Sequence, residues 1–132
     1  MSLITDLITH ITTNSSTFNR VEHAWTMEAI DEHTNEVPAL FLSHGIETSL
    51  EASTSPVVNQ QTTKEINIYI VCDSSELESI MSEVNSLVQG WQYDQYHTQM
   101  MHKKGLPQDI NGKYIWYMET YYTKYHRRSS LN

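Results

Sequence analysis

The chain has 132 residues and a mass of 15.3 kDa, the size of one ordinary domain. Its net charge of −8 argues against a dedicated nucleic-acid binder, which normally carries a basic surface. The single cysteine, Cys72, excludes an internal disulfide, and no apolar run approaches the roughly 20 residues that a membrane-spanning helix needs. These features predict a soluble protein made in a reducing cytoplasm, with no membrane partner.

The charge is distributed unevenly along the chain. Residues 1–94 contain 14 acidic and 2 basic residues, for a net charge of −12. Residues 95–132 contain 6 basic and 2 acidic residues, for a net charge of +4. Such a separation can direct opposite ends of a protein toward different partners or toward copies of itself. Chance placement of a few charges is the alternative.

The N-terminal part predicts one helix followed by less regular segments. Residues 2–12 carry apolar side chains at helical spacing, with Ser2 as the N-cap. Residues 18–36 are ambiguous between a strand and a helical turn, and they end in a polar loop. Pro38 then opens a short apolar strand that Gly45 closes.

The middle of the chain contains a polar segment, a strand and a second helix. Residues 47–63 predict a long exposed loop or a hairpin that extends beyond the core. Residues 64–72 alternate isoleucines with other side chains, as expected of a strand. Residues 75–89 form an amphipathic helix, for which Ser75 and Glu78 predict a capping box. Gly90 fits the left-handed position after that helix.

The C-terminal part predicts two strands, at about residues 96–102 and 113–126. The turn-forming residues between them, at 103–112, predict a loop. The order of helix, strands, helix and strands favours an α+β fold: a single domain, residues 1–132, with a mostly antiparallel β-sheet and two main helices packed on one face.

No pattern of catalytic or metal-binding residues is found. The seven histidines lack ligand spacing, and His97 and His102 should point to opposite faces of a strand. Cys72 ends an apolar strand, where cysteines are usually buried and inert. The sequence has neither a nucleophile elbow nor a glycine-rich phosphate loop. We therefore expect no catalytic residue, no metal and no cofactor.

The last predicted strand is aromatic on both faces. Tyr114, Trp116 and Tyr122 alternate with a second set at 117, 121 and 125. A strand that is apolar on both faces needs cover on both sides, and one layer of helices covers only one. The second face therefore predicts a protein interface, although surface tyrosines are an alternative. The interface candidates are Trp116, Tyr117, Tyr121, Tyr125, Arg127, Arg128, Lys103 and Lys104.

A different class of function uses the same residues. Aromatic side chains interleaved with basic ones can bind single-stranded nucleic acid by stacking. The aromatic strand with Lys124, Arg127 and Arg128 at its end therefore leaves a small nucleic-acid-binding module as an alternative.

The order of features resembles the tail terminator (tail completion) proteins of long-tailed bacteriophages. The resemblance runs from about residue 3 to Arg128 and rests on patterns rather than on a catalytic signature. It comprises the N-terminal amphipathic helix and four further segments, VPALFL at 37–42, the strand at 65–71, LVQGW at 87–91 and YIWYM at 114–118 with its continuation to Arg127.

This resemblance implies a structural virion protein and transfers no catalytic residue. It implies a homo-oligomer, with a hexamer expected, that forms a ring at the neck-proximal end of the tail tube. The implied partners are the tail tube protein and a neck or head-completion protein, contacted through the segments 47–63 and 103–112. DNA would only pass through the lumen, repelled by acidic side chains, and assembly would occur in the host cytoplasm. A head–tail adaptor or neck protein of similar size is the nearest alternative.

Overall fold

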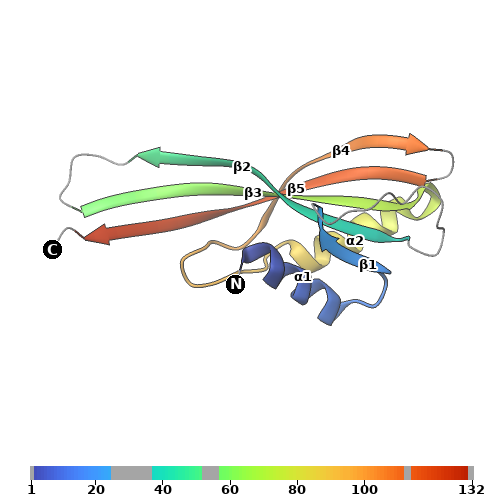
Figure 1. Ribbon diagram of the computed structural model, residues 1–132, viewed down its shortest axis with the longest axis horizontal. Coiled ribbons are helices and arrows are strands. Elements are labelled where there is room, and N and C mark those ends of the chain that lie inside the picture. Colours follow the sequence, from blue (N-terminus) through green and yellow to red (C-terminus); the bar gives the residue numbers. More distant parts are fainter. Residues whose placement is uncertain (1, 25–36, 52–56, 112–113, 131–132) are drawn as a thin grey trace.

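The computed structural model describes residues 2–24, 37–51, 57–111 and 114–130 (Figure 1). Five strands form one sheet in the order β1-β2-β3-β5-β4, antiparallel except for the parallel pair β1 and β2. The predicted α+β fold with a mostly antiparallel sheet is confirmed. The elements are α1 (Leu3–Asn14), β1 (Arg20–His23), β2 (Ala39–Glu51), β3 (Val57–Asp73), the short 3-10 helix η3 (Ser74–Glu76), α2 (Leu77–Val88), β4 (Met101–Asn111) and β5 (Tyr114–Ser130).

Both helices pack against the same face of the sheet, which we call the helix face. The opposite side is the open face. Helix α1 begins as predicted, because the Ser2 hydroxyl accepts a hydrogen bond of 3.1 Å from the Thr5 amide. The core on the helix face contains buried side chains from both helices and from the middle of the sheet, including Ile4, Leu7, Leu40, Leu42, Ile66, Ile68, Ile70, Ile80 and Val84.

The start of α2 differs from the prediction. The Asp73 carboxylate, at the end of β3, accepts hydrogen bonds from the Ser75 amide at 3.0 Å and from the Ser75 hydroxyl at 2.8 Å. Ser75 therefore lies inside η3, and the predicted capping box of Ser75 with Glu78 is wrong. The left-handed glycine after the helix is confirmed, since Gly90 has a φ of +86°.

Strand β2 does not end at Gly45, as predicted, but continues to Glu51. The register with β3 shifts between His44 and Glu47, which marks a β-bulge. A Cβ atom on Gly45 would lie 3.0 Å from the Cβ of Glu65, so the glycine permits a close approach of strands instead of ending one.

The predicted strand at 96–102 and loop at 103–112 are also wrong. Residues 92–100 are largely irregular, and β4 occupies most of the predicted loop. β4 is an edge strand with two register shifts, and such a strand tolerates turn-forming residues such as Gly105 and Pro107. Of the ambiguous segment 18–36, residues 20–23 form β1 and residues 25–36 lie outside the described part.

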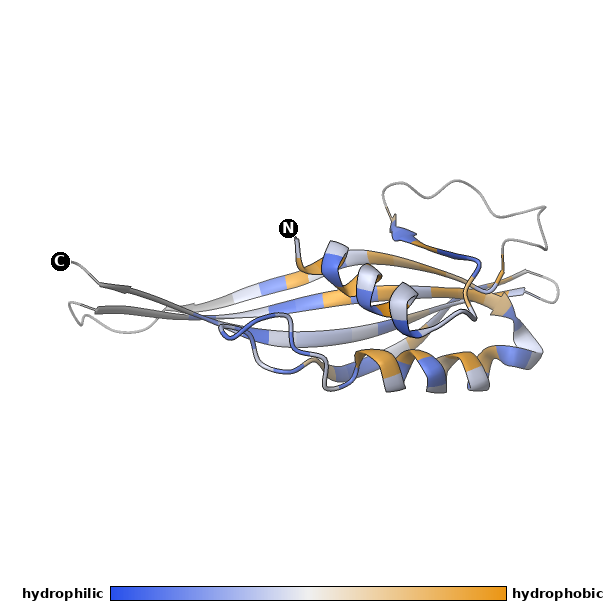
Figure 2. Cartoon of the chain, turned by 90° about the horizontal axis from the view of Figure 1, so that it is seen from below, coloured by the Kyte–Doolittle hydropathy of each residue, from blue (hydrophilic) through white to orange (hydrophobic). Residues whose placement is uncertain are grey.

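An arm of three strands extends past both helices and past β4 (Figures 1 and 2). We define the arm as residues 47–51 of β2, 57–64 of β3 and 123–130 of β5, which pair side by side. The predicted segment 47–63 thus contains the two strands of an extended hairpin, one of its two predicted forms. Residues 52–56 lie outside the described part.

Gly105→Ala should destabilise the protein by about 1–3 kcal/mol, the usual cost of forcing atoms into a packed site. A Cβ atom there would collide with the carboxylate of Glu119, which is buried, and with the hydroxyl of Tyr117. Urea denaturation measures the difference. The exposed neighbour Leu106 provides the control, because Leu106→Ala should change stability far less. Equal losses of stability from the two substitutions would contradict the close approach of Glu119 and Tyr117 to Gly105.

Candidate subunit and partner interfaces

The pairing of β3 with β5 decides which aromatic side chains face the helices. Tyr121 pairs with Ile66 and Tyr117 pairs with Ile70, so these tyrosines share the helix face with the isoleucines. Trp116 pairs with Val71, on the open face. The two aromatic faces predicted from sequence are therefore real, and the helices cover the face of Tyr117 and Tyr121.

Tyr121 is not an interface residue, contrary to the prediction. Its side chain is fully buried in the protomer's own core, and its hydroxyl donates a hydrogen bond of 3.1 Å to Asn85 Oδ1 on α2. Burial raises the pKa of the Tyr121 phenol above its usual value, and the nearby Glu119 adds to the effect. Tyr117 packs against the same core and is half-buried. The tyrosines of this face therefore serve the protomer's own fold.

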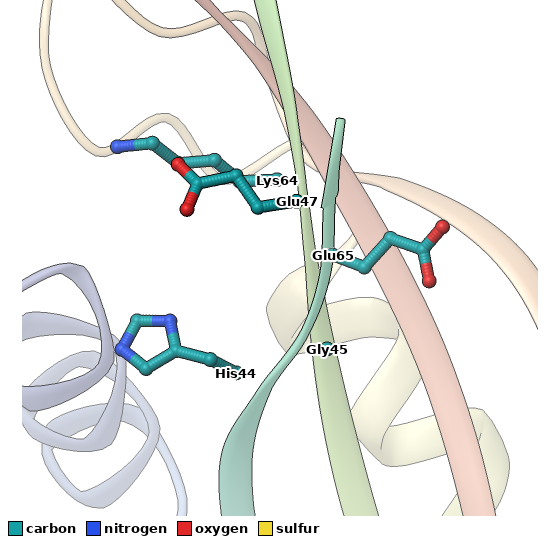
Figure 3. Close-up of a pocket in the computed structure, with 5 residues that line it drawn as sticks. All are labelled: His44, Gly45, Glu47, Lys64 and Glu65. Carbon is teal, nitrogen blue, oxygen red and sulfur yellow. The ribbon is translucent and has the colours of Figure 1, made fainter. Parts of the chain in front are cut away.

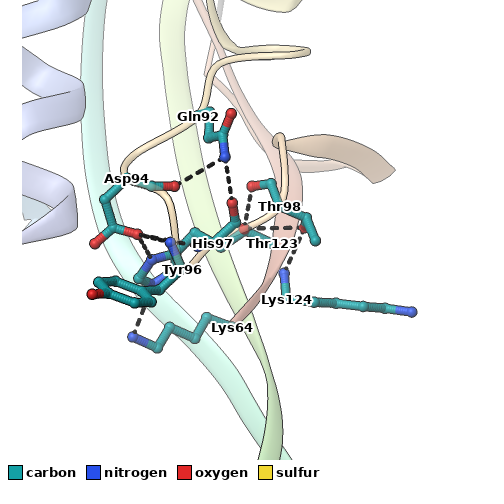
Figure 4. A network of polar contacts seen from close by, with 8 residues as sticks. All are labelled: Lys64, Gln92, Asp94, Tyr96, His97, Thr98, Thr123 and Lys124. Carbon is teal, nitrogen blue, oxygen red and sulfur yellow. Dashed lines mark hydrogen bonds and ion pairs between the residues drawn. The ribbon is translucent and has the colours of Figure 1, made fainter. Parts of the chain in front are cut away.

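A polar network around His97 and Lys64 lies at the base of the arm (Figure 4), and Tyr125 packs against both of these side chains. The Lys64 Nζ lies 4.5 Å from the centre of the Tyr125 ring, a cation–π contact, and the His97 ring lies 4.7 Å from the same ring. His97 is buried, with its Nδ1 2.6 Å from Asp94 Oδ1 and its Nε2 3.3 Å from Lys64 Nζ. The predicted placement of His97 and His102 on opposite faces of one strand is wrong, because His97 lies in the loop before β4.

This loop, residues 92–100, also forms backbone hydrogen bonds with the outer edge of β5 at the base of the arm. The Thr98 amide donates to the Lys124 carbonyl at 2.9 Å, and the His126 amide donates to the Tyr96 carbonyl at 3.0 Å. Burial acts to raise the pKa of the Asp94 carboxyl, but hydrogen bonds from His97 and Tyr96 outweigh it and hold that pKa below its usual value. Nothing in the sequence marks this network, because its members come from three distant parts of the chain, Lys64, residues 92–98 and residues 123–125.

The open face carries an apolar group that the helices do not cover. The rings of Phe41 and Trp116 stack with their centres 6.0 Å apart, beside the half-buried Tyr69. A cavity of about 350 Å³ opens here, lined by Ala24, Ser43, Tyr69, Gln108 and Trp116. Trp116 is thus the predicted aromatic candidate on the open face. Tyr69 was missed, although the alternation of β3 places it opposite the isoleucines of that strand.

The four basic interface candidates lie in different parts of the structure. Lys103 pairs with the largely buried Glu65, at 2.5 Å between Nζ and Oε2, so its charge is used within the protomer. Lys104 is exposed on the edge strand β4. Arg127 and Arg128 lie on β5 in the arm, and their side chains are outside the described part. The structure therefore does not gather the eight candidates into one surface.

A second cavity, of about 220 Å³, lies where the arm leaves the sheet (Figure 3). It is lined by His44, Gly45, Glu47, Lys64 and Glu65. Glu47 and Lys64 are cross-strand partners, and their side chains extend side by side, whereas Glu65 points away from them (Figure 3). The bulge at Gly45 thus changes which side chains share a face at the base of the arm.

The described residues contain no group of three His, Cys, Asp or Glu side chains that could hold a metal ion. The predicted burial of Cys72 is confirmed, and burial together with the nearby Glu76 and Asp73 raises the pKa of its thiol to about 11. Within the described part of the chain, neither helix is long and apolar enough to cross a membrane.

The sequence was compared with models of known protein families. The model for the phage tail terminator protein family matches residues 3–131, nearly the whole chain. The chain belongs to the phage tail terminator family. A search of curated proteins finds no match. Family membership identifies the chain as a structural protein of the bacteriophage tail, and the resemblance seen in the sequence is confirmed.

Asp94→Asn should lower the stability of this family member at pH 7 by less than about 1 kcal/mol, because the carboxylate is 39% exposed and screened by water. The folded-state pKa is depressed, so the stabilisation is present above the unfolded value of about 3.8 and is lost as the pH falls through the folded-state pKa. Thermal melts from pH 7 to pH 2 should show the two proteins converging. A difference that persists at pH 2 would contradict the role of the charge, and Asp109→Asn, at an exposed position on β4, is the control.

The Cys72 thiol should react slowly with Ellman's reagent in the native protein, because it is buried and largely protonated at pH 8. In 8 M urea the same thiol should react at the rate of free cysteine. Similar rates in the two conditions would show that Cys72 is exposed.

Proposed function

We propose that the protein forms a ring at the head-proximal end of the tail tube, ends tube polymerisation there and joins the tail to the neck. The observation that carries the proposal is the family match over residues 3–131. The open face supports it, because the half-buried Trp116 and Tyr69 present apolar area there that the two helices do not cover. Interfaces are enriched in such aromatic side chains.

The nucleic-acid-binding alternative loses its main support. A stacking platform needs several exposed aromatic rings along one strand face. Tyr121 is fully buried, and Tyr117 and Tyr125 pack against the protomer's own side chains. The chain's net charge of −8 would also repel DNA. This repulsion suits a lumen through which DNA passes without being bound.

The partners follow from the proposed position. A homohexamer would contact the tail tube protein on one side and a neck or head-completion protein on the other. The arm extends past the helices, and β4 is the edge strand of the sheet (Figure 1). They overlap the predicted contact segments 47–63 and 103–112. Assembly in the host cytoplasm and a neck-proximal place in the virion complete the proposal.

The purified protein should give a species of six times its mass of 15.3 kDa by native mass spectrometry, and rings by negative-stain imaging. Added to polymerising tail tube protein, it should shorten the tubes and appear at one end of each, because a capped end cannot grow. Tubes of unchanged length without a density at the tip, together with a strictly monomeric free protein, would overturn the proposal. Heat-denatured protein is the control for nonspecific shortening.

A further inference from the structure

The two outer edges of the arm have no partner strand among the described residues along 47–51 of β2 and 127–130 of β5. β1 pairs only with Ala39–Leu42, so no described strand lies along the outer edge of β2 from Ser43 to Glu51. On the other side, β4 pairs with β5 only as far as Tyr122. The loop before β4 bonds to β5 as far as His126, and no described residue pairs with the outer edge of 127–130. Unpaired backbone N–H and C=O groups at such edges are templates for another strand.

The edges of the rest of the sheet are less suited to pairing. β4 has two register shifts, and Pro107 lacks the N–H that a neighbouring strand would need. β4 also carries the exposed Lys104. Bulges, prolines and lysines are the usual features that prevent an edge strand from pairing with another chain. β1 has only four residues. The outer edge of β2 from Glu47 to Glu51 contains no proline, lysine or register shift. On the other side of the arm, residues 127–130 of β5 contain no proline or lysine, and no described residue pairs with their outer edge.

The two arm edges carry opposite charge. In the arm, β2 has Glu47 and Glu51 and no basic residue. The arm portion of β5 has Lys124, Arg127 and Arg128 and no acidic residue. The sheet order β1-β2-β3-β5-β4 thus turns the charge separation along the sequence into a separation across the sheet. Each edge attracts the other kind of edge and repels its own kind.

We infer that neighbouring subunits join through their arms, with the β2 edge of one copy against the β5 edge of the next. The inference rests on the proposed ring and names the contact that builds it. Such a contact is heterologous, as closed rings require. Both strands run toward the tip of the arm (Figure 1), so rotation about an axis along the arm brings them together in parallel. In a closed ring no arm edge then remains open.

Charge exchange between the two edges tests the contact. The first variant, Ser49→Lys with Glu51→Lys, makes the β2 edge basic. The second, Arg127→Glu with Arg128→Glu, makes the β5 edge acidic. The cross-strand partners of these positions are the uncharged Thr62, Gln60 and Asn59, so pairing within the arm is not opposed by new like charges.

Each variant alone would place like charges on both sides of the contact. We expect its assembly to need at least about tenfold more protein than the wild type, because like charges across an interface are unfavourable. An equimolar mixture should restore assembly, since each variant's altered edge fits an edge of the other. With one variant labelled with ¹⁵N, native mass spectrometry should show hexamers that contain three copies of each.

Glu78→Lys on α2 reverses an exposed charge outside the arm and should leave assembly unchanged. Variants that form rings alone as readily as the wild type, or a mixture of folded variants that fails to assemble, would overturn the arm contact and leave the ring standing. A wild-type protein that neither forms a ring nor caps tail tubes would overturn the proposed function itself. If circular dichroism shows that either double variant is unfolded, the single changes Glu51→Lys and Arg128→Glu repeat the exchange.

Discussion

The antiparallel pairing of β3 with β5 is the constraint on which the rest of the structure depends. It is continuous over 17 residues of each strand, from Val57 with Ser130 to Asp73 with Tyr114. Because directly paired residues share a face, the isoleucines of β3 fix which side chains of β5 enter the core. One register therefore buries Tyr121, leaves Trp116 on the open face and carries both strands beyond the core into the arm.

The sequence predicts the parts of this fold that depend on local periodicity. The two amphipathic helices, the β3 core strand and the aromatic last strand all have a clear period, and all are present. Trp116 and Tyr121 were correctly assigned to opposite faces, but alternation alone does not say which face the helices cover. That choice depends on pairing with β3, a contact between distant parts of the chain, and it decides that Tyr121 belongs to the core.

The errors at β2 and β4 have a common physical cause. Gly45, Gly105 and Pro107 are turn-forming residues by local preference, yet each lies within a strand. β-bulges in β2 and β4 allow the strands to continue through these residues. At Gly45 and Gly105 the missing side chain leaves room for a neighbouring side chain that approaches closely. The His97 network is invisible for a related reason, since Lys64 and Tyr125 approach it only through the β3–β5 register.

The arm differs from the rest of the protein in what stabilises it. Neither helix reaches it, and the described pairing within it consists of three strands that no helix covers (Figure 1). Its β3 portion, VVNQQTTK, is mostly polar, so its sequence supplies little apolar area for a core. Isolated ribbons of few strands are marginally stable in water. The Lys64, His97 and Tyr125 contacts fix the arm at its base, and pairing with neighbouring copies would add hydrogen bonds along its edges. Association and ordering of the arm would then be coupled, so that the contact that closes the ring also completes the fold of each subunit.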